Sequence, residues 1–530
     1  MALNFLNYDA NARSLEGQAL NQRIRRNLWQ GGFLAFTVYV TVSMLQTSYI
    51  SYTAKGLEID FAIVAWFLLL IGLSSILYEP RFGVYLTLPL SLAGDPVMTW
   101  WYPFDVNFSS EESLLFLHNS LIISPLEAFL IVTLLSWLGR ILLFHRDRLR
   151  EHITTGPLFI PVLIFTLFVL FGLFYGVVIN GGDAKIALWE SRSILYLPLI
   201  FFLTTNLIVT RKHLKTLVWA IITGIFVEGA LGTRFFLVVM NASLAGYTDI
   251  MDHPAAIHMN AAFVYCAAVW LYQVSYSKRF IIIGMLPFIG LTYMAAQRRS
   301  AFVSLGIALG LLLCVLFKLN RKLFFVAAPT AALVGVLYLG AFWNSGSALA
   351  LPAQAIKSVI APDAVGEADS DSNRYRIVEN ANSQWTIRNN FLTGVGFGNK
   401  FWILIPMADI SFFEWWEYIT HNSILWIWMK MGVGGFVSML MMVALSLMRG
   451  SEMIWKMPNN ELGAIASWAT LYLVMHFMYA YVDISWSHQN MLFAGTTIAI
   501  LNIIEAVEAR PIPIPKPRWA WMKVVDPNLE

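Results

Sequence analysis

The chain has 530 residues, of which 58% are hydrophobic and only 13% are charged, and its mean hydropathy is +0.64. Because a soluble domain carries about 25% charged residues, this composition excludes an ordinary soluble protein. The formal net charge of +3 gives no reason to expect nucleic acid as a partner.

Apolar runs of about 20 residues, the length that crosses a bilayer, recur along the whole chain. Hydropathy and flanking charge predict about fourteen spans, or roughly twelve to fourteen because the third run is short and contains proline. We therefore expect an all-α polytopic membrane protein. The predicted spans are residues 31–50, 60–78, 82–94, 121–143, 157–178, 193–209, 215–239, 257–276, 280–296, 301–317, 323–343, 422–447, 463–481 and 490–507.

The distribution of Lys and Arg predicts the orientation in the membrane. The first 30 residues are polar and basic, too long and too charged for a cleaved signal peptide, so we expect the first span to remain as an anchor. With the N-terminus inside, most basic residues fall on the cytoplasmic side, which is the positive-inside pattern of a bacterial inner-membrane protein. Both termini are then cytoplasmic.

These predictions divide the chain into five segments. Residues 1–30 form a cytoplasmic segment and 31–343 form eleven spans. Residues 344–421 form a large periplasmic loop, 422–507 form three more spans, and 508–530 form a cytoplasmic, proline-rich tail. A loop as long as 344–421 is usually functional.

The middle of this loop is predicted to be helical, with Ser372 or Asn373 as its N-cap. Its side chains separate into two faces. The apolar face carries Ile377, Val378, Ala381 and Trp385. The polar face carries Arg376, Glu379, Asn380 and Ser383. After this helix, the spacing of Gly394, Gly396 and Gly398 favours a tight turn where the backbone approaches its neighbours closely.

Two groups of arginines are predicted on the outer side. Arg298 and Arg299 lie at the end of one span, and Arg374, Arg376 and Arg388 lie in the loop. One interpretation is that the first pair extends to lipid headgroups. However, arginine is the usual side chain for bidentate phosphate binding, so the two groups predict a diphosphate site at the membrane surface.

His421 is the candidate general base. It directly precedes the span that follows the loop, and so lies at the N-terminus of that helix. The partial positive charge of a helix N-terminus disfavours imidazolium, so we expect a neutral ring that can accept a proton. The same helix end favours a bound phosphate. The alternative is an interfacial histidine without a catalytic role.

Other polar residues give weaker signals. Asp252 and His253 form a second outer cluster, and Glu414 and Glu417 lie in an aromatic stretch that fits an interfacial belt but could also contact sugar hydroxyls. Glu228 and Arg234 lie in or near a span, where they are either functional or a structural pair. The histidines show no metal-ligand spacing, so we expect no metal or cofactor.

Taken together, these residues resemble the O-antigen ligase and Wzy-type polysaccharide polymerase superfamily over roughly residues 250–450. The resemblance is carried by the following segments, in chain order: Asp252-His-Pro254, Arg299-Ser-Ala-Phe302, Arg376 followed eighteen positions later by Gly394-Val-Gly-Phe-Gly398, His421-Asn-Ser-Ile-Leu425, and Met431-Gly-Val-Gly-Gly435. Arg298 stands where the family has serine, and Phe391 where proline is usual. Which arginine of each pair matters therefore stays open.

The resemblance implies a GT-C-like glycosyltransferase architecture, an undecaprenyl-diphosphate-linked glycan as donor, a hydroxyl as acceptor, and inversion without a metal. His421 would deprotonate the acceptor, while Arg299 and Arg376 would hold the diphosphate. The remaining expected substrate-binding residues are Arg298, Arg374, Arg388, Asn422, Gly394, Gly396, Gly398, Glu414, Glu417, Asp252 and His253.

Several functions stay open. The acceptor could be lipid A–core, a lipid-linked repeat unit or a protein, with membrane lipids and a chain-length regulator as further partners. A polyprenyl-monophosphate sugar transferase would use Glu58 and Asp60. A transporter or flippase would need ionisable groups deep in several spans, whereas the polar groups identified here concentrate at the outer surface.

Overall fold

The computed structural model describes residues 61–510, except for 96, 98–103, 112, 114, 145–152, 244–249, 254, 362–366, 409 and 411–413. The predicted span 31–50, the residues Glu58 and Asp60, and the tail from residue 511 onward lie outside the described residues. Within the described part, every regular element is a helix.

Ten of the described helices are long and apolar enough to cross a membrane. They are α4 (Pro125–Phe144), α6 (Phe159–Phe174) with the π-helical turn η2 (Tyr175–Ile179), α7 (Ala184–Leu207), α8 (Arg211–Arg234) with η3 (Phe235–Val239), α10 (Tyr276–Ala296), α11 (Arg299–Leu319), α12 (Arg321–Phe342), α15 (Ser423–Lys456), α16 (Glu461–Val482) and α17 (His488–Ala509). The chain is therefore a multi-pass membrane protein.

Six further elements complete the described part. They are α2 (Phe61–Tyr78), α3 (Arg81–Ala93), α9 (Ala255–Leu271), the short 3-10 turn η4 (Ala348–Ala350), α13 (Leu351–Ile360) and α14 (Glu367–Asn389). Each predicted span from 60–78 onward overlaps one of the described helices. The helices α13 and α14 lie in the segment 344–421, between α12 and α15.

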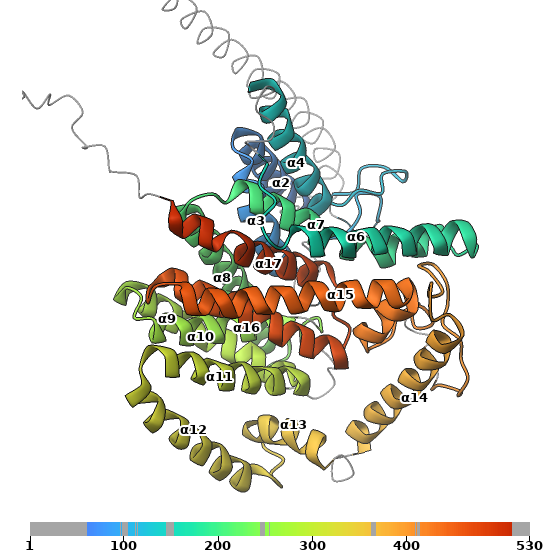
Figure 1. The fold of residues 1–530 in the computed structure, drawn as a ribbon. Coiled ribbons are helices and arrows are strands. Elements are labelled where there is room, and N and C mark those ends of the chain that lie inside the picture. Colours follow the sequence, from blue (N-terminus) through green and yellow to red (C-terminus); the bar gives the residue numbers. More distant parts are fainter. Residues whose placement is uncertain are drawn as a thin grey trace, which may run out of the picture.

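The long helices run side by side, with α16 and α17 at the centre (Figure 1). In the most apolar stretches of α16 and α17, 83% and 89% of the residues are buried inside the protein, whereas in that of α12 no residue is buried. Gly495 lets α17 approach α7 closely, since a Cβ there would lie 2.5 Å from the carbonyl oxygen of Leu197. Small residues at such crossings are typical of packed membrane helices.

The helix α15 is broken at Gly432, whose φ of 66° and ψ of −171° are not helical. The segment 391–398 packs into this break and pairs with its free backbone groups. Val433 donates to Phe391 O over 3.0 Å, and Val395 donates to Met429 O over 2.8 Å. A break at membrane depth is tolerated only where the freed backbone groups find partners in the protein.

The glycines of this segment confirm the predicted tight turn. Gly394, Gly396 and Gly398 have φ values of 69°, 79° and 82°. A Cβ on Gly396 would lie 2.2 Å from the Cα of Gly176 in η2, so a larger residue would separate the two segments.

A fully buried ion pair holds the first part of α15. Lys430 Nζ lies 2.7 Å from Glu190 Oε1 of α7 and donates to Asn399 O over 2.6 Å. Glu190 Oε2 accepts from the backbone of Gly398 over 2.6 Å. These bonds satisfy two charges that would be costly to bury alone, and they fix residues 423–431 against α7.

Ionisable side chains therefore do occur inside the helix bundle, in contrast to the expectation that polar groups concentrate at one surface. A second case is Glu228, whose Oε1 lies 3.4 Å from Nδ1 of the buried His258. Of the two alternatives for Glu228 and Arg234, the structural pair is not formed, because Glu228 is completely buried beside His258 whereas Arg234 is exposed.

The loop helix differs from its prediction in two respects. It begins at Glu367, so Ser372 and Asn373 lie inside it and neither is the N-cap. Its polar face is the buried one: Glu379 and Ser383 are buried, while Ile377 is 69% exposed. The physical reason is that polar side chains on this face bind neighbouring backbone, as Asn382 does with Leu404 and Ile405.

Replacing Gly432 by alanine should destabilise the protein by about 1–3 kcal/mol, which is the cost of holding a residue in a backbone conformation that essentially only glycine adopts. In addition, a Cβ there would lie 2.1 Å from Leu392 O. Thermal unfolding of the purified protein in detergent measures the effect. Gly310→Ala is the matched control, because a Cβ at that position in α11 meets nothing within 4 Å. Equal unfolding temperatures for the two variants would contradict this account of the break.

Candidate active site

His421 lies directly before Asn422, the N-cap of α15, and is bound twice by Glu379 of α14. Its backbone N–H donates to Glu379 Oε2 over 2.8 Å, and its Nδ1 lies 3.1 Å from both carboxylate oxygens. A carboxylate acts only as an acceptor, so Nδ1 carries the proton in this contact. Nε2 is then the nitrogen that can accept a proton, and the side chain keeps 24% of its surface exposed.

Glu379 orients the His421 ring and holds it in one tautomer, as in sites where a carboxylate positions a histidine base. Glu379 was not among the partners expected for His421 from the sequence.

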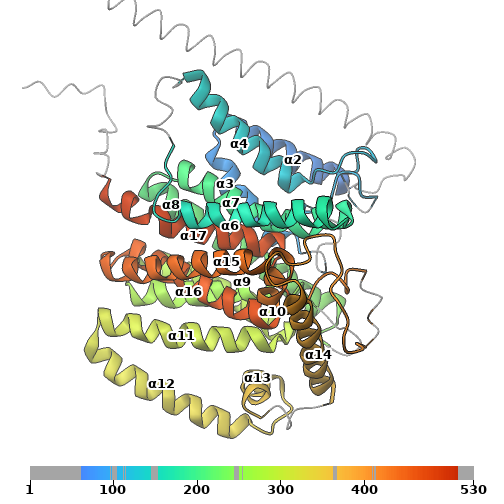
Figure 2. The same ribbon diagram turned by 45° about the vertical axis from the view of Figure 1, so that its right-hand side comes forward.

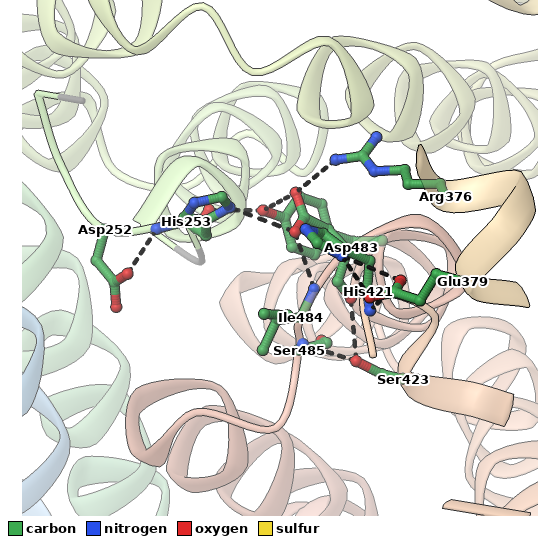
Figure 3. A network of polar contacts seen from close by, with 10 residues as sticks. Asp252, His253, Arg376, Glu379, His421, Ser423, Asp483, Ile484 and Ser485 are labelled. Carbon is green, nitrogen blue, oxygen red and sulfur yellow. Dashed lines mark hydrogen bonds and ion pairs between the residues drawn. The ribbon is translucent and has the colours of Figure 1, made fainter. Parts of the chain in front are cut away.

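Asp483 is the centre of a second set of contacts at the same place (Figure 3). It is the C-cap of α16. Its Oδ1 lies 3.3 Å from His253 Nδ1, and its Oδ2 lies 3.8 Å from Arg376 Nη2. Tyr479 donates to Oδ2 over 3.2 Å. Arg376 and Glu379 lie one turn apart on α14, so this helix contacts both Asp483 and His421.

The electrostatics keep Asp483 ionised. Burial alone would raise the pKa of Asp483, but the hydrogen bond and charge of His253, with the charge of Arg376, hold this pKa well below its usual range. A carboxylate with such partners is stable as an anion.

Backbone contacts hold these segments together. Ser423 donates through Oγ to Asp483 O over 3.0 Å and accepts from the backbone of Ser485 over 2.8 Å. Tyr479 Oη lies 2.6 Å from His253 O, and Asp252 donates its backbone N–H to Asp95 Oδ2 over 2.9 Å. The start of α15, the end of α16 and the segment before α9 therefore meet at one end of the bundle, called the site end below.

Three buried polar atoms of α14 near His421 have no hydrogen-bond partner among the described residues: Tyr375 Oη, Arg376 Nε and Asn380 Oδ1. The Tyr375 ring lies edge-on to the His421 ring, with centroids 5.8 Å apart. Burial, with the charge of Glu379 in addition, raises the pKa of Tyr375, so its hydroxyl stays a donor. Because buried polar atoms in proteins are nearly always paired, these groups favour a polar ligand beside His421.

The structure separates the predicted arginines. Arg298 is the N-cap residue of α11, whose first turn contacts α9 through the bond from Asn260 Nδ2 to Ala301 O over 2.8 Å. Arg299 is the next residue and begins α11. Arg374 and Arg388 are exposed on α14. Arg388 lies about 18 Å along the helix from Arg376, so the three loop arginines do not form one cluster.

Several other predicted substrate-binding residues have local structural contacts. The Asn422 side chain accepts from the backbone of Leu425 over 3.1 Å, and Glu417 forms an ion pair with Lys400. Glu414 is exposed. Gly394 and Gly396 contact the break in α15, whereas Gly398 packs against the start of α7.

Sequence reasoning missed Glu379 and Asp483 as site residues. Glu379 was noted only as part of a polar helix face. Asp483 follows an apolar span directly, and an acidic residue at that boundary is the signal that could have indicated it. Among the described residues, no group of three His, Cys, Asp or Glu side chains is placed to hold a metal ion.

Residues 280–440 match a family described as O-antigen ligase. This stretch, less than a third of the chain, is similar to the O-antigen ligase family. The O-antigen ligase stretch contains Arg298, Arg299, Arg376, Glu379 and His421, whereas His253 and Asp483 lie outside it. The family is one of membrane glycan-transferring ligases and polymerases. No curated protein matches the chain.

We expect Asp483→Asn to change stability in a pH-dependent way. The folded-state pKa lies below the ordinary value of 3.8, so the carboxylate stabilises the fold at pH values above 3.8 and loses this contribution as the pH falls toward the folded-state pKa. The variant should therefore unfold at a lower temperature than the native protein at pH 7. This difference should shrink below about pH 4.

Thermal unfolding of the detergent-solubilised protein between pH 3 and pH 7 measures both effects, with Glu414→Gln as the exposed control. A difference between Asp483→Asn and the native protein that is the same at every pH would show that the charge of Asp483 does not stabilise the fold.

Proposed function

We propose that the chain is a metal-independent, inverting glycosyltransferase. It moves an undecaprenyl-diphosphate-linked oligosaccharide or polysaccharide en bloc onto an acceptor hydroxyl at the periplasmic face of the bacterial inner membrane. The observation that carries the proposal is the contact of Glu379 with Nδ1 of His421, which leaves Nε2 as a base within reach of a substrate.

In the proposed reaction, Nε2 of His421 takes the proton of the acceptor hydroxyl. The acceptor oxygen then attacks the anomeric carbon of the donor sugar from the face opposite the diphosphate. The bond between that carbon and the phosphate oxygen breaks, and the glycan is joined to the acceptor with inverted configuration. A general base in this position contributes about 10²–10⁴-fold to the rate.

The leaving group is a diphosphate whose negative charge grows as the bond breaks. Arg376 is supported as one of its partners by its place beside Asp483 and by its Nε, which is buried without a hydrogen-bond partner among the described residues. Arg298 and Arg299 at the start of α11 would supply the second positive charge. Fixed cations of this kind stabilise the developing charge without reorganisation.

The proposed orientation places the site end in the periplasm and both termini in the cytoplasm. It rests on the positive-inside distribution of Lys and Arg. The proposed division of the chain, with a large periplasmic loop at 344–421, follows from the same orientation, and the proposed GT-C-like architecture rests on the family resemblance.

The acceptor distinguishes an O-antigen ligase from a polymerase of O-antigen or exopolysaccharide. A ligase would transfer onto lipid A–core, and a polymerase onto the next lipid-linked repeat unit with a chain-length regulator as partner. Incubating the purified protein with one lipid-linked donor and each acceptor in turn separates these functions.

A transporter or flippase is the rival from another class, and charged groups deep in the spans would favour it. However, Lys430 and Glu190 bind each other and the backbone of Asn399 and Gly398. Because both charges are already paired within the protein, this ion pair fixes the break in α15 and is poorly suited to bind and release a transported substrate. A monophosphate sugar transferase would instead depend on Glu58 and Asp60.

We expect His421→Ala and Arg376→Ala to abolish the glycan product in cells while the lipid-linked precursor accumulates, because one lacks the base and the other the diphosphate partner. Gel analysis of the glycans, with protein levels measured in the membrane fraction, shows the effect. His118→Ala is the control, since His118 is exposed and, among the described residues, its side chain bonds only to its neighbour Ser120.

Normal product from His421→Ala at a normal protein level would remove the proposed base. Loss of product from Glu58→Gln, with His421→Ala active, would favour the monophosphate sugar transferase.

A further inference from the structure

The helix α14 has a second face that the proposed reaction does not use. Opposite Glu379 and Ser383, six side chains follow one another at helical spacing and form what we call the outward stripe. The residues of the outward stripe are Arg374, Ile377, Val378, Ala381, Trp385 and Arg388. Ile377 and Trp385 are 69% and 39% exposed, and both arginines are exposed. The apolar face of this helix therefore points away from the protein, the reverse of a helix in a soluble domain.

Three contacts fix the level of α14 relative to the membrane spans. Arg376 contacts Asp483 at the end of α16, and Glu379 contacts His421 at the start of α15. Just past the end of α14, Phe391 O accepts from Val433 at the break in α15. In both ribbon views α14 crosses obliquely near one end of the long helices (Figure 2).

The break in α15 lies at the boundary of the bilayer. Residues 432–456 form about 37 Å of helix at 1.5 Å per residue, slightly more than the ~30 Å hydrocarbon core. Gly432 is therefore at the site-end limit of the core, and the backbone of Phe391 lies at the same level. The C-terminal end of α14 is thus held at the membrane boundary.

The apolar surface continues from this end of α14 into the side of α15. The Phe391 ring lies 5.5 Å from that of Trp428, which stacks on Phe436 at 4.4 Å. Leu392 is 73% exposed, and Val437 on the next turns of α15 is 55% exposed. A span that exposes such residues contacts lipid, so the lipid-facing surface of α15 leads directly to α14.

The composition of the outward stripe matches a lipid surface. Its two arginines lie about 21 Å apart along the helix, with Trp385 and aliphatic side chains between them. Basic residues beside an apolar face are typical of helices that lie in the plane of an anionic membrane. Tryptophan is enriched at this boundary.

We propose that the outward stripe lies on the phospholipid leaflet at the site end. Ile377, Val378, Ala381 and Trp385 contact the boundary between headgroups and acyl chains, and Arg374 and Arg388 bind anionic headgroups. This assignment explains why these two arginines are directed away from Arg376. It also makes α14 a helix with lipid on one face and Glu379 on the other, so that the membrane surface sets the height of His421. The lipid contact does not depend on the proposed reaction.

The test uses the full-length protein in nanodiscs that contain anionic phospholipid. In a background with Cys266→Ala and Cys314→Ala, a cysteine is introduced at Ala381 or Ile377, each in a separate variant, and labelled with a small fluorophore. Lipids carrying a nitroxide near the headgroup end of the acyl chain should quench both labels. The unlabelled cysteines should react several-fold more slowly with a membrane-impermeant maleimide than the control His118→Cys, because His118 is exposed in the segment before α4 and does not lie on α14.

Two outcomes would overturn the proposal. Reaction at positions 377 and 381 as fast as at position 118 would mean that the stripe faces water. Protection at these positions without quenching by the nitroxide lipid would mean that protein, such as a second copy of the chain, covers the stripe. Neither outcome bears on glycan transfer, so the lipid contact and the proposed reaction fail independently.

Discussion

Glu379 is almost completely buried, and its two carboxylate oxygens bind both the ring and the backbone of His421. A buried carboxylate is costly unless its oxygens are paired, so this contact constrains where α14 can lie. Once Glu379 is in place, the helical repeat brings Arg376, one turn earlier, to Asp483. The proposed base, its orienting acid and the positive charge proposed for an anionic leaving group therefore come from a single rigid element and the span ends that it touches.

The broken helix α15 is the second element that the contact between Glu379 and His421 depends on. Residues 423–431 must leave the direction of the span so that His421 can reach α14, and Gly432 supplies the non-helical backbone that this requires. The freed groups bind the segment 391–398, and Lys430 is neutralised by Glu190. The glycines that the family resemblance emphasises thus shape the break in α15, and their effect on the chemistry is through the position of His421.

Local sequence properties predicted much of this molecule. Hydropathy located each described span, because the length and apolarity of a span are set by the bilayer and not by its neighbours. His421 and Arg376 were identified by residue type at a predicted surface. Glu379 was missed as the partner of His421 because the two lie 42 residues apart, and only the folded loop joins them. The buried face of α14 was not predictable from its amphipathic pattern, since the polar face of this helix contacts protein and its apolar face, in our proposal, contacts lipid. For the same reason Arg374 and Arg388 were grouped with Arg376 although they occupy another face.

The most direct test of the account is a double-mutant cycle on glycan transfer by the purified protein, using Glu379→Gln, His421→Ala and the double variant. If Glu379 acts by orienting His421, its loss slows transfer in the native background and has little further effect once His421 is absent. Rate losses that multiply in the double variant would contradict the account, because Glu379 would then contribute to the reaction independently of the histidine it contacts.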